Sequence, residues 1–145
     1  MHILIADDSE DDIALLRHAL KRAGIPNPVH ACRDGQEALD YLKGDGIYAD
    51  RIKHPFPRML ILDLKMPNLT GLEVLRWVKE HPECCVIPTI IVTNSREPQD
   101  VREAYTLGAN AYFVKPSKLE DTQNLFKNLQ AFWSMAELPE LPAKC

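Results

Sequence analysis

Residues 59–63 read Met-Leu-Ile-Leu-Asp, four apolar residues closed by a carboxylate. A continuous apolar run of this length is typical of a strand buried on both faces of a parallel sheet. Similar runs occur at 3–6, 87–92 and 111–114, and a weaker one occurs at 29–32. The sequence therefore predicts five short buried strands.

Segments with a helical spacing of apolar residues separate these runs. In the first segment Ser9 is followed three residues later by Asp12, as in a capping box, and Gly24 provides a stop. Four further helices are predicted around residues 38–42, 72–78, 101–107 and 125–132. Alternating strands and helices favour an α/β fold: a doubly wound, five-stranded parallel sheet of flavodoxin-like order 2-1-3-4-5 with five helices.

The length of 145 residues indicates one domain. We expect the domain to span residues 1–133. The segment 134–145, with Pro139 and Pro142, should be a tail without regular structure. Residues 43–57 form a connection longer than usual, and are either an insertion or a functional loop.

Composition argues against several classes of protein. Lys and Arg total 17 against 21 Asp and Glu, and there is no basic block, so nucleic-acid binding is not expected. No apolar run approaches the ~20 residues of a membrane helix, and no secretory signal is visible. The sequence thus favours a cytoplasmic location. The four cysteines lack metal-site spacing and are expected to be reduced thiols, with Cys32 in the core.

Polar residues follow the predicted strands where the strands end: Asp7-Asp8, Asp63, Thr93 and Lys115. The carboxyl ends of parallel strands share one edge of the sheet, which is where ligands bind in such folds. Three carboxylates placed together repel one another unless a cation is present, and Mg²⁺ prefers oxygen ligands. A carboxylate beside Mg²⁺ and an ammonium group is suited to phosphoryl transfer.

These positions resemble the signature of bacterial response-regulator receiver domains. The motifs that carry the resemblance are Asp7-Asp8, the run Asp63-Leu64-Lys65-Met66-Pro67 followed by Gly71, the single Thr93, and Tyr112-Phe113-Val114-Lys115-Pro116. The likeness covers about residues 2 to 133.

The resemblance implies a phosphoacceptor and a metal site. Asp63 would accept the phosphoryl group. Asp8 and Asp63 would ligate Mg²⁺ directly, the carbonyl of Lys65 would complete the protein ligands, and Asp7 would act through water.

The resemblance also implies a switch. Thr93 would donate its hydroxyl to the phosphoryl group and Lys115 would pair with it. Tyr112 would turn inward when Thr93 moves. The bond between Lys115 and Pro116 would be cis.

A narrower resemblance is to stand-alone regulators paired with phytochrome-type histidine kinases. It rests on the 43–57 loop, Phe132-Trp133 and the leucine-proline tail at 138–142. Those regulators commonly dimerise, so Phe132, Trp133 and Leu138 are candidate dimer contacts, although they could instead complete the monomer core. A sensor histidine kinase would be the upstream partner. With no room for an output domain, a downstream protein or a phosphorelay partner would receive the signal.

Other readings remain open at individual positions. Asp7 and Asp8 could simply favour a helix N-terminus, Thr93 could be a cap, and Tyr112 could serve packing. The first-turn acids Glu10, Asp11 and Asp12 are expected to be solvated.

Two other functions compete with a switch that is not an enzyme. An aspartate-nucleophile phosphatase of the haloacid dehalogenase type would need a second acid where Lys65 stands. A flavin module would need a phosphate loop where the Asp7-Asp8 pair would repel phosphate.

Overall fold

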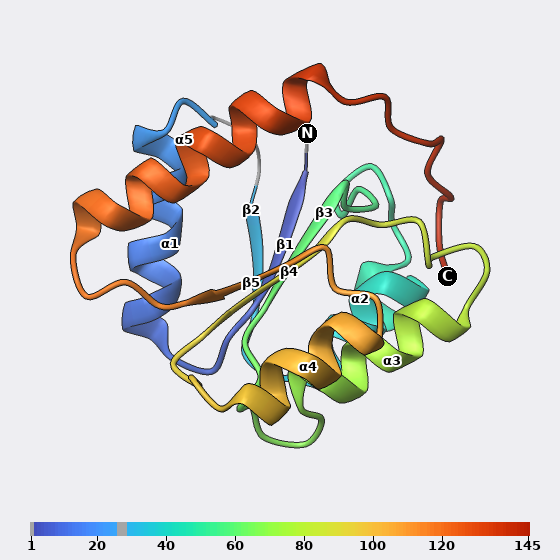
Figure 1. Cartoon of the computed structure of the whole chain (residues 1–145). Helices are drawn as coiled ribbons and strands as arrows, with labels where there is room; N and C mark the ends of the chain where they lie inside the picture. The colour runs from blue at the N-terminus through green and yellow to red at the C-terminus, as the bar shows by residue number, and fades with distance from the viewer. Residues whose placement is uncertain (1, 26–28) are drawn as a thin grey trace.

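The computed structural model describes residues 2–25 and 29–145. Its centre is a five-stranded parallel sheet (Figure 1) in the order β2-β1-β3-β4-β5. The strands are β1 (Ile3–Ala6), β2 (Val29–Cys32), β3 (Met59–Leu62), β4 (Thr89–Thr93) and β5 (Ala111–Val114). The predicted fold class and strand order are confirmed; β4 begins two residues later than expected.

Helices cover both faces of the sheet. They are α1 (Glu10–Arg22), α2 (Gly35–Lys43), α3 (Gly71–Glu80), α4 (Pro98–Thr106) and α5 (Leu119–Met135), with a 3-10 turn η1 at Gly46–Tyr48. Figure 1 shows α1 and α5 on one face and α2, α3 and α4 on the other. None of the helices in the described part of the chain is long and apolar enough to cross a membrane.

Alternation along the strands sorts the apolar side chains into two cores. On the α1–α5 side lie Ile3, Ile5 and Ile61 with Phe126 of α5, which is 1% exposed. On the other side, under α2 and α3, lie the strand residues that alternate with these, for example Leu4. Successive strand side chains point to opposite faces, so every apolar residue of the central strands is buried.

Side-chain caps fix where the helices begin relative to the sheet edge. Ser9 accepts a hydrogen bond from Asp12 N, and Asp34 accepts one from Glu37 N. Thr70 and Glu73 form a reciprocal capping box at the start of α3. Each cap lies in the loop that leaves the carboxyl end of a strand, so the helix N-termini lie around that edge of the sheet.

The C-terminal segment differs from expectation in two ways. Helix α5 continues to Met135, past the expected boundary at 133, and the rest of the segment packs on its own domain. Leu141 contacts the α2–α3 core, and Cys145 N donates to Leu42 O at 3.0 Å. Figure 1 shows this segment returning from α5 to α2 and α3.

A disulfide joins Cys84 and Cys145, so the expectation of four reduced thiols is wrong for this pair. The two residues are 61 positions apart in sequence but their Cα atoms lie 5.6 Å apart, within the usual disulfide range. Only the return of the tail brings them together, which spacing alone does not reveal. Cys32 and Cys85 are free, and Cys32 is buried in the core as predicted.

The long 43–57 connection packs against the domain through aromatic side chains. Tyr48 is 5% exposed, and Tyr41 donates a hydrogen bond to Pro55 O at 2.8 Å. Arg51 donates to Leu42 O at 2.8 Å. The connection therefore forms a folded cover on the α2 side.

His2 lies beside this cover and predicts a pH dependence of stability. Burial, helped by the nearby His30 and His54, lowers the pKa of His2 to about 4 from 6.5. The unfolded chain therefore binds a proton that the folded chain excludes between these values. We expect the contribution of neutral His2 to stability to be fully present above pH 6.5. As pH decreases from 6.5 toward 4, the free energy of unfolding should fall.

Urea unfolding at a series of pH values tests this expectation. His2→Gln should show a shallower loss of stability between pH 6.5 and 4, because the amide does not titrate. The expectation fails if the variant and the wild type lose stability in parallel.

Candidate functional site

Backbone hydrogen bonds continue the sheet one residue beyond three of the strands. Asp7 N donates to Cys32 O at 3.1 Å, Asp63 N to Ala6 O at 2.9 Å, and Lys115 N to Thr93 O at 2.7 Å. Because the extension keeps these residues in register, their side chains meet at one carboxyl edge. The structure thus brings Asp7, Asp63 and Lys115 together, as the strand ends predicted.

The ammonium group of Lys115 is the centre of this cluster. Its Nζ lies 2.8 Å from Asp63 Oδ2, 2.8 Å from Asp7 Oδ2 and 2.6 Å from Asp12 Oδ2. The Lys115 side chain is 11% exposed and that of Asp7 is 1% exposed. Three carboxylates therefore share one positive charge in a partly desolvated place, which leaves an excess of negative charge.

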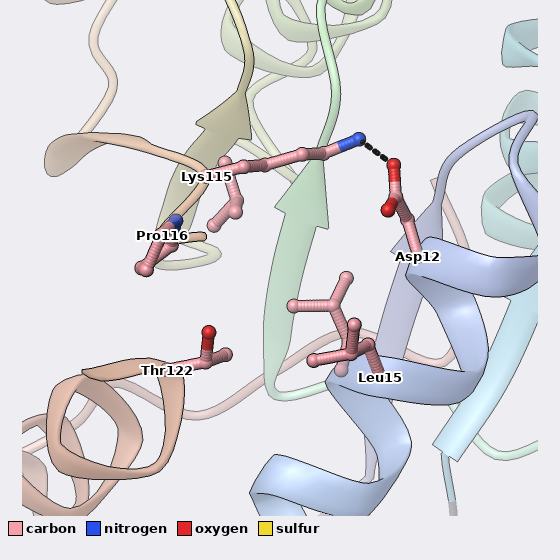
Figure 2. Close-up of a pocket in the computed structure, with 7 residues that line it drawn as sticks. Asp12, Leu15, Lys115, Pro116 and Thr122 are labelled. Carbon is pink, nitrogen blue, oxygen red and sulfur yellow. Dashed lines mark hydrogen bonds and ion pairs between the residues drawn. The ribbon is translucent and has the colours of Figure 1, made fainter. Parts of the chain in front are cut away.

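Asp12 was missed as a member of the site, because its place in the first turn of α1 indicated only a solvated acid. The structure corrects this: Figure 2 shows its carboxylate pointing to Lys115 across the sheet edge. The backbone N–H of Asp12 donates a hydrogen bond to Ser9 Oγ, while its side chain faces Lys115 at the end of β5. A small hollow of about 30 Å³ adjoins the pair, with Leu15, Pro116 and Thr122 on its walls.

Burial and charge act together on the protonation of the site. Burial alone would lower the pKa of Lys115. Its contacts with the carboxylates of Asp12, Asp63 and Asp7 outweigh burial and raise the pKa, so the amine stays protonated. Burial raises the pKa of Asp7, and the ion pair with Lys115 offsets this only in part. A further cation would relieve the remaining cost.

The residues present fit a divalent cation. Carboxylate oxygens of Asp7, Asp8 and Asp63 all lie within 4.8 Å of one another. Asp7 Oδ2 is buried and, although near Lys115, makes no hydrogen bond of good geometry, so it keeps a lone pair for a ligand. Asp8 is exposed and leaves an opening to solvent. Hard oxygen donors with room for water match Mg²⁺ or Mn²⁺.

The loop after β3 holds Asp63 in place. Leu64 N donates to Asp63 Oδ1 at 2.7 Å, and Gly71 N donates to Leu64 O at 2.9 Å. Lys65 follows with an exposed side chain, and its carbonyl as a metal ligand stays a prediction. A Cβ atom at Gly71 would stand 2.0 Å from Asp63 O, so α3 can approach the acid only through glycine.

Gly71→Ala should therefore disturb the site. Alanine is the better helix former by about 1 kcal/mol, so any loss of stability must come from the steric contact. We expect the free energy of unfolding to fall by roughly 1–3 kcal/mol as the backbone at Asp63 shifts. Urea unfolding measures the change. Unchanged or increased stability of Gly71→Ala would contradict the argument.

Thr93 and Tyr112 are linked through a residue between them in space. Ser95 N donates to Thr93 Oγ1 at 3.4 Å, and the Tyr112 hydroxyl donates to Ser95 O at 2.9 Å. Ser95 Oγ donates in turn to Asp100 Oδ2 at the start of α4. Thr93 is 1% exposed, while Tyr112 is half-buried against the α2–α3 core. Movement at Thr93 would therefore reach Tyr112 and α4 through the β4–α4 loop.

The expected cis bond before Pro116 is wrong. The described residues contain no cis peptide bond, so Lys115–Pro116 is trans. Trans is the more stable isomer of an X-Pro bond by about 0.5–1 kcal/mol, and Lys115 reaches its three carboxylates with this backbone.

Comparisons with known proteins agree with this geometry. Residues 3–127 match the family described as response regulator receiver domain. Response regulator Rcp1 of Synechocystis is 33% identical over 141 residues, covering 97% of this chain and 92% of its own. The crystal structure of its Mn²⁺-bound form superposes with a TM-score of 0.84 at 32% identity, covering 96% of this chain and 99% of that one.

Two other solved structures are similar. The phosphorylated cyanobacterial phytochrome response regulator RcpA has a TM-score of 0.86 at 33% identity. RPA3017, a response regulator in red light signaling of R. palustris, has a TM-score of 0.89 at 34% identity. Each match covers 96% of this chain and 98% of the other. Proteins of this kind partner with sensor histidine kinases and hold a divalent cation at an acidic pocket. Fold, sequence and acidic edge together show that this chain belongs to the response regulator receiver domain family, with phytochrome response regulators among its relatives.

Proposed function

We propose that this receiver domain accepts a phosphoryl group on Asp63 from a sensor histidine kinase in a Mg²⁺-dependent reaction. The observation that carries the proposal is the contact of Lys115 Nζ with Asp63 Oδ2 at 2.8 Å. Asp63 belongs to a cluster of three carboxylates with Asp7 and Asp8. This arrangement supplies a nucleophile, a counter-charge and hard oxygen donors in one place.

Each residue has a defined part in the proposed reaction. An oxygen of Asp63 forms a bond to phosphorus as the bond from phosphorus to the donor's nitrogen breaks. Lys115 neutralises phosphoryl oxygens, and Thr93 donates its hydroxyl to them. Asp8, Asp63 and the Lys65 carbonyl would hold Mg²⁺ directly and Asp7 would hold it through water; the bound ion would supply charge neutralisation. The chemistry is mainly positioning and electrostatics, and the protein catalyses only its own phosphorylation and dephosphorylation.

The proposed output is a change of surface. Once Thr93 turns toward the phosphoryl group, its contact with Ser95 N is lost, and the hydroxyl of Tyr112 loses the Ser95 carbonyl in its present position. The β4–α4 loop and the half-buried Tyr112 then repack. A population shift from mostly inactive to mostly active requires about 5 kcal/mol of differential stabilisation, a reasonable demand on a dianionic group with two cationic neighbours.

Mass spectrometry after incubation with acetyl phosphate tests the proposal. With Mg²⁺ the wild type should gain one phosphoryl group; with chelator it should gain none. Asp63→Asn should gain none under either condition. Equal labelling of wild type and Asp63→Asn would refute Asp63 as the acceptor. Turnover of small phosphoesters would favour the phosphatase alternative instead.

We further infer a phytochrome-type kinase as the partner, a cytoplasmic location and a homodimer, all from similarity to RcpA and its relatives. The dimer is supported by exposed apolar side chains on α5: Phe132 is 66% exposed and Met135 is 88% exposed. Trp133 packs on the α1–α5 core and shares a hollow with Leu138, so these two candidates are partly used within the monomer.

Light scattering with and without a phosphoryl mimic tests the dimer. A dimer of wild type that becomes monomeric in Phe132→Glu supports it. A monomer at high concentration in both states would count against it. A phosphotransfer profile against the histidine kinases of the same organism would identify the upstream partner.

A further inference from the structure

A second group of metal-ligating side chains lies away from the acidic edge, between β2 and α2. His30 and Cys32 are two residues apart on a strand, so they point to the same face of the sheet. Glu37 is in the first turn of α2, directly above them. Ligand atoms of all three residues lie within 4.8 Å of one another.

The chemistry of this group differs from that of the phosphorylation site. An imidazole, a thiol and a carboxylate form the kind of mixed nitrogen, sulfur and oxygen set that binds Zn²⁺ tetrahedrally, with three protein ligands leaving a fourth position for water. Hard Mg²⁺ has no preference for sulfur. The two sites would therefore select different ions.

Two features show that this group of side chains has hydrogen-bonding capacity that the protein itself does not use. The Nε2 atom of His30 is buried and makes no hydrogen bond. Buried polar atoms are nearly always paired, so an imidazole with an unpaired buried nitrogen, in a group that also holds a thiol and a carboxylate, marks a place for a ligand. The carboxylate of Glu37 accepts from Tyr48 Oη at 2.8 Å and from Arg33 N at 2.9 Å. These bonds orient it while leaving further lone pairs available.

The surroundings favour a cation, and one of the three residues also lines an open groove. Burial, helped by the carboxylates of Glu37, Asp34 and Asp40, raises the pKa of the Cys32 thiol, and a bound cation would offset that cost. An open groove of about 470 Å³ connects Glu37 to solvent, and it has acidic but no basic lining residues: Glu37, Asp40, Asp45, Gly46, Ile47 and Tyr48. A divalent ion is attracted into such a groove, whereas an anion is repelled.

We propose that His30, Cys32 and Glu37 bind one Zn²⁺ ion, with water as the fourth ligand. The thiol proton passes to solvent on binding. The ion links the edge strand β2 to α2. Cys32 O accepts the hydrogen bond of Asp7 N, so the two metal sites are joined by one backbone contact.

Cobalt substitution tests the proposal on the intact, oxidised protein with Mg²⁺ in excess to fill the acidic edge. One equivalent of Co²⁺ should produce a thiolate-to-cobalt charge-transfer band that Zn²⁺ abolishes. Only Cys32 and Cys85 are free thiols in the described chain, so Cys85→Ser is the matched control and should keep the band. Asp63→Asn should also keep it.

Three variants remove one ligand each: Cys32→Ala, His30→Gln and Glu37→Gln. Each should weaken Zn²⁺ binding at least tenfold in calorimetry, and Cys32→Ala should lose the charge-transfer band. Glu37 is partly exposed and its amide replacement can keep an acceptor for Tyr48, so this variant is informative even if a core variant is poorly folded. Absence of the band in wild type, its loss in Cys85→Ser, or unchanged affinity of Glu37→Gln would each overturn the proposal.

Discussion

Lys115→Met will weaken both the fold and the phosphorylation of this protein. In the wild type, one ammonium group compensates Asp7, Asp12 and Asp63, two of which are buried. Removing the cation leaves carboxylates desolvated and mutually repulsive, and breaking a buried ion pair in this way costs about 3 kcal/mol or more of unfolding free energy. Urea unfolding in chelator should show this loss.

Two conditions should restore stability to the variant. Mg²⁺ supplies the missing charge, so the stabilisation by Mg²⁺ should be larger in Lys115→Met than in the wild type. Acid should also help: burial raises the pKa of Asp7, so as pH falls this carboxyl takes up a proton in the folded state before it would in the unfolded chain. The deficit between variant and wild type should therefore shrink as pH decreases from neutral toward the ordinary pKa range of an aspartate.

The same substitution should slow phosphorylation by acetyl phosphate roughly 10²-fold, since it removes a preorganised charge from the phosphoryl oxygens. Lys118→Met is the matched control, because Lys118 is exposed and its side chain makes no capping bond. Equal stability of Lys115→Met and Lys118→Met in chelator would contradict the electrostatic account. Equal rates of phosphorylation would contradict the proposed part of Lys115 in the reaction.

The sequence predicted the fold and the acidic edge for the same reason: polar residues close unbroken apolar strands. Once β3 was recognised, Asp63 had to lie at the carboxyl edge, and parallel pairing brought Asp7 and Lys115 to it. These predictions need only strand direction and the order of elements along the chain. They do not depend on side-chain conformation.

The parts that were missed depend on contacts across the fold. Asp12 has the spacing of a capping residue, and nothing local shows that its carboxylate faces β5. Ser95 joins Thr93 to Tyr112 through its backbone, which sequence cannot reveal. The Lys115–Pro116 isomer was inferred from a family and not from any local signal in the chain. The grouping of Cys32 with His30 and Glu37 likewise requires the pairing of a strand with a helix turn.

The disulfide between Cys84 and Cys145 yields the other large prediction. It closes a loop across a sequence separation of 61 residues, and cross-linking a loop of that length restricts the unfolded chain by about 4 kcal/mol. Cys145→Ser should therefore lower the free energy of unfolding by an amount near this value when the proteins are compared without reductant. Leu141 still packs against the core in the variant, so the native fold should persist.

Reductant and a neighbouring cysteine separate this effect from ordinary packing. In dithiothreitol the wild type and Cys145→Ser should unfold at nearly the same urea concentration, because both lack the cross-link. Cys85→Ser, next to the bonded residue, should leave the oxidised stability almost unchanged, since Cys85 is free. A difference between wild type and Cys145→Ser that persists in reductant would mean that packing of the tail, and not the cross-link, stabilises the fold. No difference under oxidising conditions would mean that the bond does not form in solution.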